Sequence, residues 1–248
     1  MMSLVNLLKE DFTVRKIICN VLTHAIISFL FFLVFYLGYS TSFINHKTMD
    51  GELFILPNII VFLTVLSSFL FSLQEWDKVV NQKAYLYCYK TAGIFETSIF
   101  WGKMLVMVFH MLITFFVTAL VMLLFSGISI KMSRFLYFFL FTALSGILFI
   151  QIAAFIKYWV KTRYFMQTNI VYINILLFLL SGLVLPFYLY SGPLYTVIKF
   201  LPHGIIFEGS RNLLLNHEFI WVELLYVGIL TLALAITNHI LYKKELAI

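Results

Sequence analysis

Long apolar runs alternate with short polar connections along almost the whole chain. Six of these runs are each near the roughly twenty residues that an α-helix needs to cross a bilayer. They cover about Ile17–Tyr39, Leu53–Leu73, Met104–Phe125, Phe135–Ile156, Phe165–Leu185 and Phe219–Tyr242. The pattern therefore predicts six transmembrane helices in a single polytopic domain over residues 1–248.

A different pattern precedes the first run. Leu4, Leu8 and Phe12 recur every fourth residue among charged residues, which predicts an interfacial amphipathic helix over Met1–Lys16. The next run, Ile17–Tyr39, is long enough to span a bilayer and has no small-residue cleavage site, so we expect it to be kept and not removed as a signal peptide.

The composition is that of an integral membrane protein. Hydrophobic residues make up 62% of the chain and charged residues 11%, against roughly 45–50% and 25% in soluble domains. The connections are too short to hold a soluble catalytic domain. We therefore expect an all-α membrane protein that contacts lipid and has no nucleic-acid partner.

The distribution of Lys and Arg predicts the orientation. Twelve of them fall in the N-terminal tail, the second and fourth loops and the C-terminal tail, and five fall in the other three loops. Because cytoplasmic loops carry the excess of basic residues, both termini are predicted to lie in the cytoplasm, with the protein in the plasma membrane.

The stretch Ser181–Leu215, between the fifth and sixth runs, predicts an external re-entrant helical hairpin. Pro193 and Pro202 each begin a short helical segment of about ten to thirteen residues. At 1.5 Å per residue each arm reaches roughly 15–20 Å, which is too short to cross the membrane. Glu208 and Arg211, three residues apart on the second arm, are expected to form an ion pair.

The longest predicted cytoplasmic connection, Gln74–Lys103, holds the second informative stretch. Its first part, Glu75–Tyr89, contains no Pro or Gly and alternates charged with bulky residues, which predicts a helix lying along the membrane surface. The same stretch also fits a second interpretation, a solvated helix that carries the basic residues of the positive-inside pattern.

Both stretches resemble the permease subunits of type-2 ABC exporters. That family has Pro-x-x-x-x-x-Glu-x-x-Arg after its fifth span, which Pro202, Glu208 and Arg211 match after an apolar run that ends at Pro186. Its cytoplasmic coupling helix begins with an acidic residue and ends in Gly-Lys. Glu75 and Gly102-Lys103 match these positions, whereas Asn81-Gln82 stands where Gly-Thr is usual and the usual Pro near Lys90 is missing. The resemblance covers nearly the whole chain.

The resemblance implies a transmembrane permease that works as a pair with two separate ATPase subunits. ATP and Mg²⁺ would be bound by the ATPase and no cofactor by this chain. The residues implied in coupling to the ATPase are Glu75, Asp77, Lys78, Lys83, Gly102 and Lys103, with the basic loop Lys157–Arg163 as a secondary contact. The implied substrate cavity lies between the second and fifth spans, with Asn58, Phe62, Asn169 and Asn174 as lining candidates. Packing and interhelical hydrogen bonds are equally good roles for these four side chains.

The absence of several sequence motifs limits the class of function further. No G-x-x-x-x-G-K-[ST] occurs, so ATP must be hydrolysed by another subunit, and no H-E-x-x-H or G-x-S-x-G indicates an enzyme. The cavity candidates are amides and an aromatic without charge, which favours an amphipathic or hydrophobic cargo such as a peptide, a drug or a lipid-like molecule. A permease for lipid-linked polysaccharide remains an alternative, as does an ion-coupled secondary transporter in which Glu223 carries a proton.

Overall fold

The computed structural model describes residues 14–38, 51–81, 91, 96–128, 130–160, 164–183, 190, 192–216 and 220–246. Every regular element in these ranges is a helix. The α-helices are α2 (Val14–Phe31), α4 (Gly51–Asn81), α6 (Glu96–Ser126), α7 (Met132–Val160), α8 (Tyr164–Phe178), α9 (Pro193–Phe200), α10 (Pro202–Arg211) and α11 (Trp221–Leu246). Three π-helical segments extend α2, α8 and α10, namely η1 (Phe32–Leu37), η2 (Leu179–Leu183) and η4 (Asn212–Asn216).

Five helices of the described chain are long and apolar enough to cross a membrane. Their apolar segments are Arg15–Leu37, Ile55–Val80, Thr97–Ser126, Met132–Trp159 and Trp221–Lys244. They agree with five of the six predicted spans and with a multi-pass membrane protein. The predicted fifth span corresponds to a shorter apolar helix, Thr168–Leu183.

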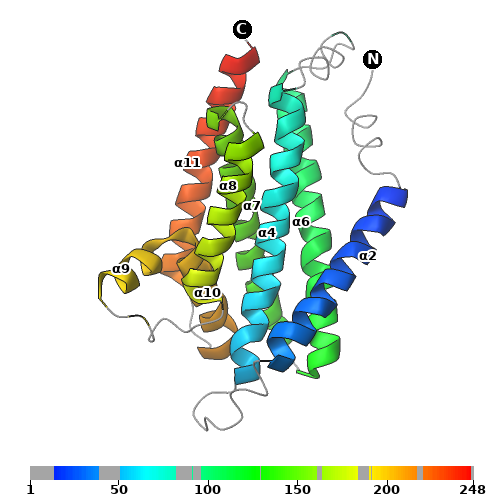
Figure 1. The fold of residues 1–248 in the computed structure, drawn as a ribbon, viewed down its shortest axis with the longest axis vertical. Coiled ribbons are helices and arrows are strands. Elements are labelled where there is room, and N and C mark those ends of the chain that lie inside the picture. Colours follow the sequence, from blue (N-terminus) through cyan, green and yellow to red (C-terminus); the bar gives the residue numbers. More distant parts are fainter. Residues whose placement is uncertain are drawn as a thin grey trace.

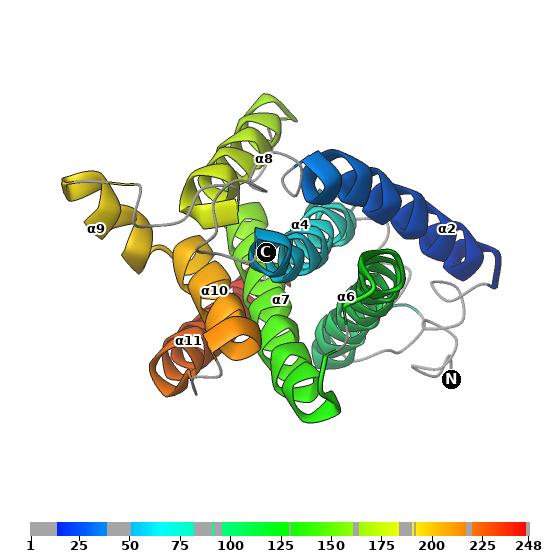
Figure 2. The same ribbon diagram turned by 90° about the horizontal axis from the view of Figure 1, so that it is seen from below.

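Helix α4 is the central element of the bundle. It contacts α6, α7, α8, α10 and η1, which extends α2, and the view along the bundle places it among these helices (Figure 2). Helix α11 packs on the far side of α7. Successive helices alternate in direction, so the first described residue of α2 and the last of α11 lie toward the same end of the bundle (Figure 1).

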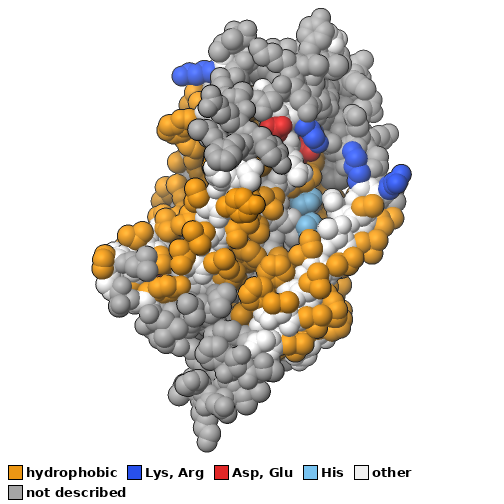
Figure 3. All heavy atoms as spheres, in the orientation of Figure 1, with side chains coloured by type: hydrophobic (Ala, Val, Ile, Leu, Met, Phe, Trp, Pro, Cys, Tyr) orange, Lys and Arg blue, Asp and Glu red, His pale blue; other side chains and the backbone are white. Residues whose placement is uncertain are grey.

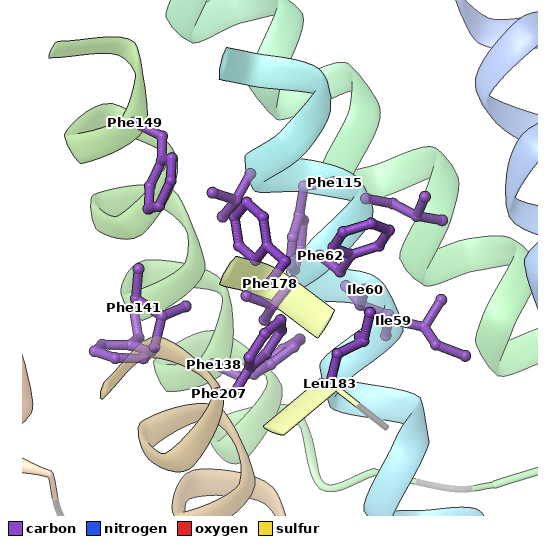
Figure 4. Close-up of a cluster of buried hydrophobic side chains, with 14 of the residues drawn as sticks. Ile59, Ile60, Phe62, Phe115, Phe138, Phe141, Phe149, Phe178, Leu183 and Phe207 are labelled. Atoms are coloured by element: carbon purple, nitrogen blue, oxygen red, sulfur yellow. The ribbon is translucent and has the colours of Figure 1, made fainter. Parts of the chain in front are cut away.

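Aromatic side chains fill the interior where α4, α6, α7, α8 and α10 meet (Figure 4). Phe115, Phe138, Phe149, Phe178 and Phe207 are all buried there. In a bilayer the helices are held together mainly by close packing and hydrogen bonds, because lipid is as apolar as the side chains. Rigid interlocking rings of this kind therefore decide which helices are neighbours.

Two close contacts between helices depend on glycine. A Cβ at Gly146 would overlap Met111 Sδ, so the absence of a side chain lets α7 approach α6. A Cβ at Gly209 would lie 2.7 Å from the ring of Phe141, so α10 and α7 meet closely for the same reason. Small residues at such crossings are typical of membrane helices.

The outer helices present apolar side chains to the surroundings. Little of the apolar segments of α2 and α11 is buried, whereas most of the segment of α4 is buried. The surface shown in Figure 3 is largely hydrophobic along the bundle, with charged side chains near one end. This distribution agrees with helices that contact lipid along their length.

Helix α4 differs from the prediction at its end. It continues without a break through Asn81, so Glu75–Asn81 prolong the second apolar helix instead of starting a separate surface helix. Helix α6 likewise begins at Glu96, ahead of the predicted start at Met104. No Pro or Gly interrupts either extension except Gly102, and buried ion pairs neutralise the charged residues there, so the helices can continue.

Several predicted segments lie outside the described residues. These are residues 1–13 of the interfacial helix, residues 82–90 and 92–95 of the Gln74–Lys103 connection, and residues 184–189, which include Pro186.

Candidate functional site

The charged cluster joins three helices at one end of the bundle. We use this name for Glu75, Asp77 and Lys78 of α4 with Lys103 of α6 and Lys157 of α7. Lys103 Nζ lies 2.9 Å from Glu75 Oε2, and Lys78 Nζ binds the other carboxylate oxygen. Lys157 Nζ lies 2.6 Å from Asp77 Oδ1. The two ion pairs to Lys103 and Lys157 therefore tie the end of α4 to α6 and to α7.

Burial makes these pairs strong constraints. The side chains of Lys103 and Glu75 are 1% and 5% exposed, and that of Lys157 is 4% exposed. An unpaired charge in such a place costs several kcal/mol, roughly 3–5 when one partner of a buried pair is removed. The two lysines are thus held to α4 by electrostatics as well as by packing.

Aromatic packing reinforces the same junction. Trp76 is fully buried between Phe100 of α6 and Tyr158 of α7, with ring centroids 5.3 and 5.8 Å away. Because Trp76 lies between Glu75 and Asp77, the ion pairs and the rings act on one turn of α4. The end of the bundle is therefore a rigid three-helix unit.

The structure brings together most of the residues predicted to couple to an ATPase. Glu75, Lys78 and Lys103 form one ion-pair group, and buried Gly102 adjoins it on α6. Asp77 pairs with Lys157, the first residue of the loop predicted as a secondary contact. Lys83, the remaining candidate, lies outside the described residues.

The two predicted short helices after the fifth run are confirmed, each beginning at a proline. Helix α9 starts at Pro193 after Gly192, whose φ of 67° favours glycine. Helix α10 starts at Pro202 and buries most of its residues, so it is part of the packed bundle. Helix α9 projects from the bundle (Figure 2).

The ion pair expected between Glu208 and Arg211 on the second arm stays a prediction. The Nε of buried Arg211 donates to the carbonyl of Phe207 at 3.3 Å, one turn earlier on the same helix. Glu208 acts electrostatically on Lys199 of α9. A hydrogen bond from Lys199 to Tyr195 raises the pKa of Lys199, with Glu208 as a second cause.

A double-mutant cycle tests this arrangement. We expect Glu208→Ala to change the free energy of unfolding by less than about 0.5 kcal/mol, as for a surface residue without a buried partner. Arg211→Ala should cost more, because its buried side chain is removed. The two changes should add within about 0.5 kcal/mol. A coupling energy of 1 kcal/mol or more in detergent unfolding experiments would show that the two side chains form the expected ion pair.

Three of the four cavity candidates meet at the junction of α4, α8 and α10. Asn58 Nδ2 donates to the carbonyls of Gly182 and Leu183 at 3.1 and 3.3 Å. Phe62 packs edge-on against Phe178 at a centroid distance of 5.4 Å.

Helix α8 is interrupted at this junction. Gly182 has a φ of 95°, outside the helical region and accessible mainly to glycine, and its carbonyl accepts one of the Asn58 hydrogen bonds. The side chain of Asn58 therefore holds the interrupted end of α8 against α4.

His203 of α10 completes the junction and was not among the predicted site residues. Its Nε2 lies 2.6 Å from Asn174 Oδ1 of α8 and donates to it. The ring packs edge-on against Phe178 and Phe149, at 4.4 and 4.9 Å between centroids. Burial lowers the pKa of His203 to about 4, so the imidazole is neutral at neutral pH.

The fourth candidate does not join this junction. Asn169 of α8 is exposed. The sequence signal for His203 is its position directly after Pro202, in the first turn of the second arm of the predicted re-entrant hairpin. Its partner Asn174 lies 29 residues earlier in the chain, and that contact is decided only by how α8 and α10 pack.

No family model, curated protein or solved structure matches this chain. Among the described residues no three His, Cys, Asp or Glu side chains gather in a group that could hold a metal ion. The charged cluster and the junction of α4, α8 and α10 are the features in which predicted site residues meet.

Proposed function

We propose that this chain is the membrane permease subunit of an ABC exporter and works with a separate ATPase and a second copy of itself. The charged cluster is the observation that carries the proposal. It connects α4, α6 and α7 at the end of the bundle from which the Gln74–Lys103 connection emerges. An ATPase that pushes on this connection would act on three helices at once.

The proposed topology has six spans with both termini in the cytoplasm. In this topology the fifth span consists of α8 and η2, which together cover the twenty residues Tyr164–Leu183, about the number that a crossing needs. In this topology the charged cluster faces the cytoplasm, where the ATPase would be. The α9–α10 hairpin then lies on the outer side as a re-entrant element.

The proposed mechanism uses rigid-body motion. Closure of the ATPases on ATP would move the ends of α4, α6 and α7 together, because buried ion pairs resist their separation. The displacement would reach the opposite end of α4, where Asn58 holds the interrupted end of α8. Movement of α8 and α10 away from α4 would open a path between the second and fifth spans.

The proposed cargo is amphipathic or hydrophobic. Asn58, Phe62 and Asn174 carry amides and an aromatic ring without charge, and the neighbouring rings of Phe149 and Phe178 are apolar. A surface of this kind suits a peptide, a drug or a lipid-like molecule better than a polyanionic glycan.

Co-expression with the cognate ATPase tests the proposal. We expect the two proteins to co-purify and the ATPase rate to change on complex formation, because the chain lacks a nucleotide-binding motif of its own. ATP-dependent uptake of an amphipathic cargo into inverted vesicles should require both subunits. Transport driven by an ion gradient in vesicles without any ATPase would contradict the proposal and favour the secondary transporter.

Charge reversal in the coupling stretch provides a second test. Lys83→Glu is expected to reduce export, because a reversed charge in the coupling stretch would repel the partner surface. Lys244→Glu, at the exposed end of α11, is the matched control and should export normally. Equal export by the two variants would show that residue 83 does not belong to the coupling surface.

A further inference from the structure

Helix α9 projects sideways from the half of the bundle opposite the charged cluster, and it runs across the long axis of the bundle (Figure 1). It contacts α10 and η2, and its buried side chain Ile198 holds it to the bundle. The view along the bundle shows that the rest of α9 extends beyond the other helices (Figure 2). The sides of α9 that do not carry Ile198 therefore face the surroundings of the bundle.

The eight residues of α9 present three different faces. Val197 and Phe200, three residues apart on one face, are 60% and 66% exposed. Tyr195 and Lys199, four residues apart, share a second face, on which Lys199 Nζ donates to the Tyr195 hydroxyl at 3.4 Å. The third face carries the buried Ile198. An apolar face beside a polar one, both turned away from the bundle, is typical of a helix that lies in a membrane interface.

The ends of α9 indicate the depth at which it lies. No side chain of the described residues caps its N-terminus, so the backbone N–H groups of the first turn need water or lipid headgroups as partners. The hydrocarbon core offers no such partners, and each unsatisfied group there is costly. At the other end the hydroxyl of Tyr226 donates to the carbonyl of Phe200 at 3.2 Å. These ends fit the membrane–water interface and not the hydrocarbon core.

The exposed apolar face of α9 continues on α11. The hydrogen bond from Tyr226 places Phe200 beside the first turns of α11, where Trp221, Val222 and Leu225 are all exposed. Helix α11 is one of the five helices long and apolar enough to cross a membrane. Trp and Tyr are enriched where membrane helices meet the headgroups. The start of α11 and α9 therefore lie at the same level of the bilayer.

The charges beside the polar face favour zwitterionic lipid. Glu208 of α10 and Glu223 of α11 both act electrostatically on Lys199. One lysine near two carboxylates gives no excess of positive charge, whereas recognition of anionic lipid depends on clusters of Lys and Arg. Burial of the apolar face in the acyl chains would then supply most of the attraction.

We propose that α9 is an interfacial anchor whose exposed face is covered by zwitterionic phospholipid. Val197 and Phe200 insert among the acyl chains, and Tyr195 and Lys199 lie among the headgroups. Because α9 contacts α10 and η2, the anchor connects the bilayer surface to the junction of α4, α8 and α10. The proposal needs a membrane but no ATPase and no cargo, so it is independent of the proposed function.

Spin labels on α9 test the anchor. The full-length protein carries Cys19→Ser and Cys88→Ser, and one new cysteine, Val197→Cys or Phe200→Cys, is labelled with a nitroxide. The protein is reconstituted into phosphatidylcholine nanodiscs. Power saturation compares relaxation by oxygen, which concentrates in lipid, with relaxation by a water-soluble nickel chelate. We expect oxygen to be the more effective agent at both positions, because both side chains would lie among acyl chains.

Two further labels provide the matched controls. Ile229→Cys, at an exposed position deeper in α11, gives the reference for lipid, and Lys199→Cys on the polar face of α9 should respond more to the nickel chelate. Gel filtration verifies folding, and exposed side chains such as Val197 and Phe200 usually contribute little to stability.

Three results would overturn the anchor. A stronger effect of the nickel chelate at Val197 and Phe200 would place α9 in water. Low accessibility to both agents, with spin–spin broadening between chains, would show that a second copy covers the face. An oxygen response at Lys199 equal to that at Val197 would place the whole helix in hydrocarbon.

Discussion

Replacing Lys103 by methionine is expected to lower the free energy of unfolding by about 3 kcal/mol. The change leaves the carboxylate of Glu75 buried without its 2.9 Å partner, and breaking a buried pair from one side costs roughly 3–5 kcal/mol. The lower end applies because Lys78 also binds Glu75. Denaturant unfolding in detergent micelles measures the loss.

The double variant separates the charge from the packing. Glu75→Gln together with Lys103→Met should recover most of the loss, because neither buried charge remains. Lys78→Met is the control, since its side chain is 41% exposed and an exposed partner contributes about 0–1 kcal/mol. If the double variant were less stable than Lys103→Met alone, the pair would not be the reason for the loss.

Lowering the pH from about 7.5 to about 5 is expected to destabilise the α8–α10 junction through His203. Burial holds the pKa of His203 at about 4 in the folded protein, below the usual 6.5. The unfolded chain therefore binds the proton at higher pH than the folded one, and stability falls as the pH drops from about 6.5 toward 4. At pH 5 the loss amounts to about 2 kcal/mol.

His203→Gln separates the loss of stability caused by protonation of His203 from the effects of the other histidines. A glutamine amide can still donate to Asn174 but does not titrate, so the variant should lose about 2 kcal/mol less than the wild-type protein between the two pH values. Unfolding of both proteins at each pH gives the comparison. Identical pH dependence would mean that the protonation of His203 does not weaken the junction.

Local sequence patterns predict most of the helices. Each spanning helix reflects the apolar character of a continuous run, a property that needs no knowledge of the neighbours. The starts of α9 and α10 followed from Pro193 and Pro202, because proline fixes the first helical turn locally. The resemblance to an exporter permease likewise rests on local motifs and stays a prediction.

Which side chains meet depends on how the helices pack. Glu75 and Lys103 were both recognised as charged residues near a membrane surface, yet their burial against each other depends on α4 continuing past Leu73 beside α6. In the same way Asp77 pairs with Lys157, 80 residues away in the chain. Within one helix, spacing alone did not indicate that the Nε of Arg211 donates to the carbonyl of Phe207.

The contacts between helices are hard to predict from the sequence because the bundle is surrounded by lipid. In a soluble protein the apolar face of a helix marks the side that packs, but here nearly every face is apolar and lipid is no worse a neighbour than another helix. The contacts of His24 with His110 and of Asn174 with His203 depend on ring stacking and on close approach at glycines. These shape-dependent contacts join residues far apart in the chain, so they leave no periodic trace in the sequence, and only the packed bundle specifies them.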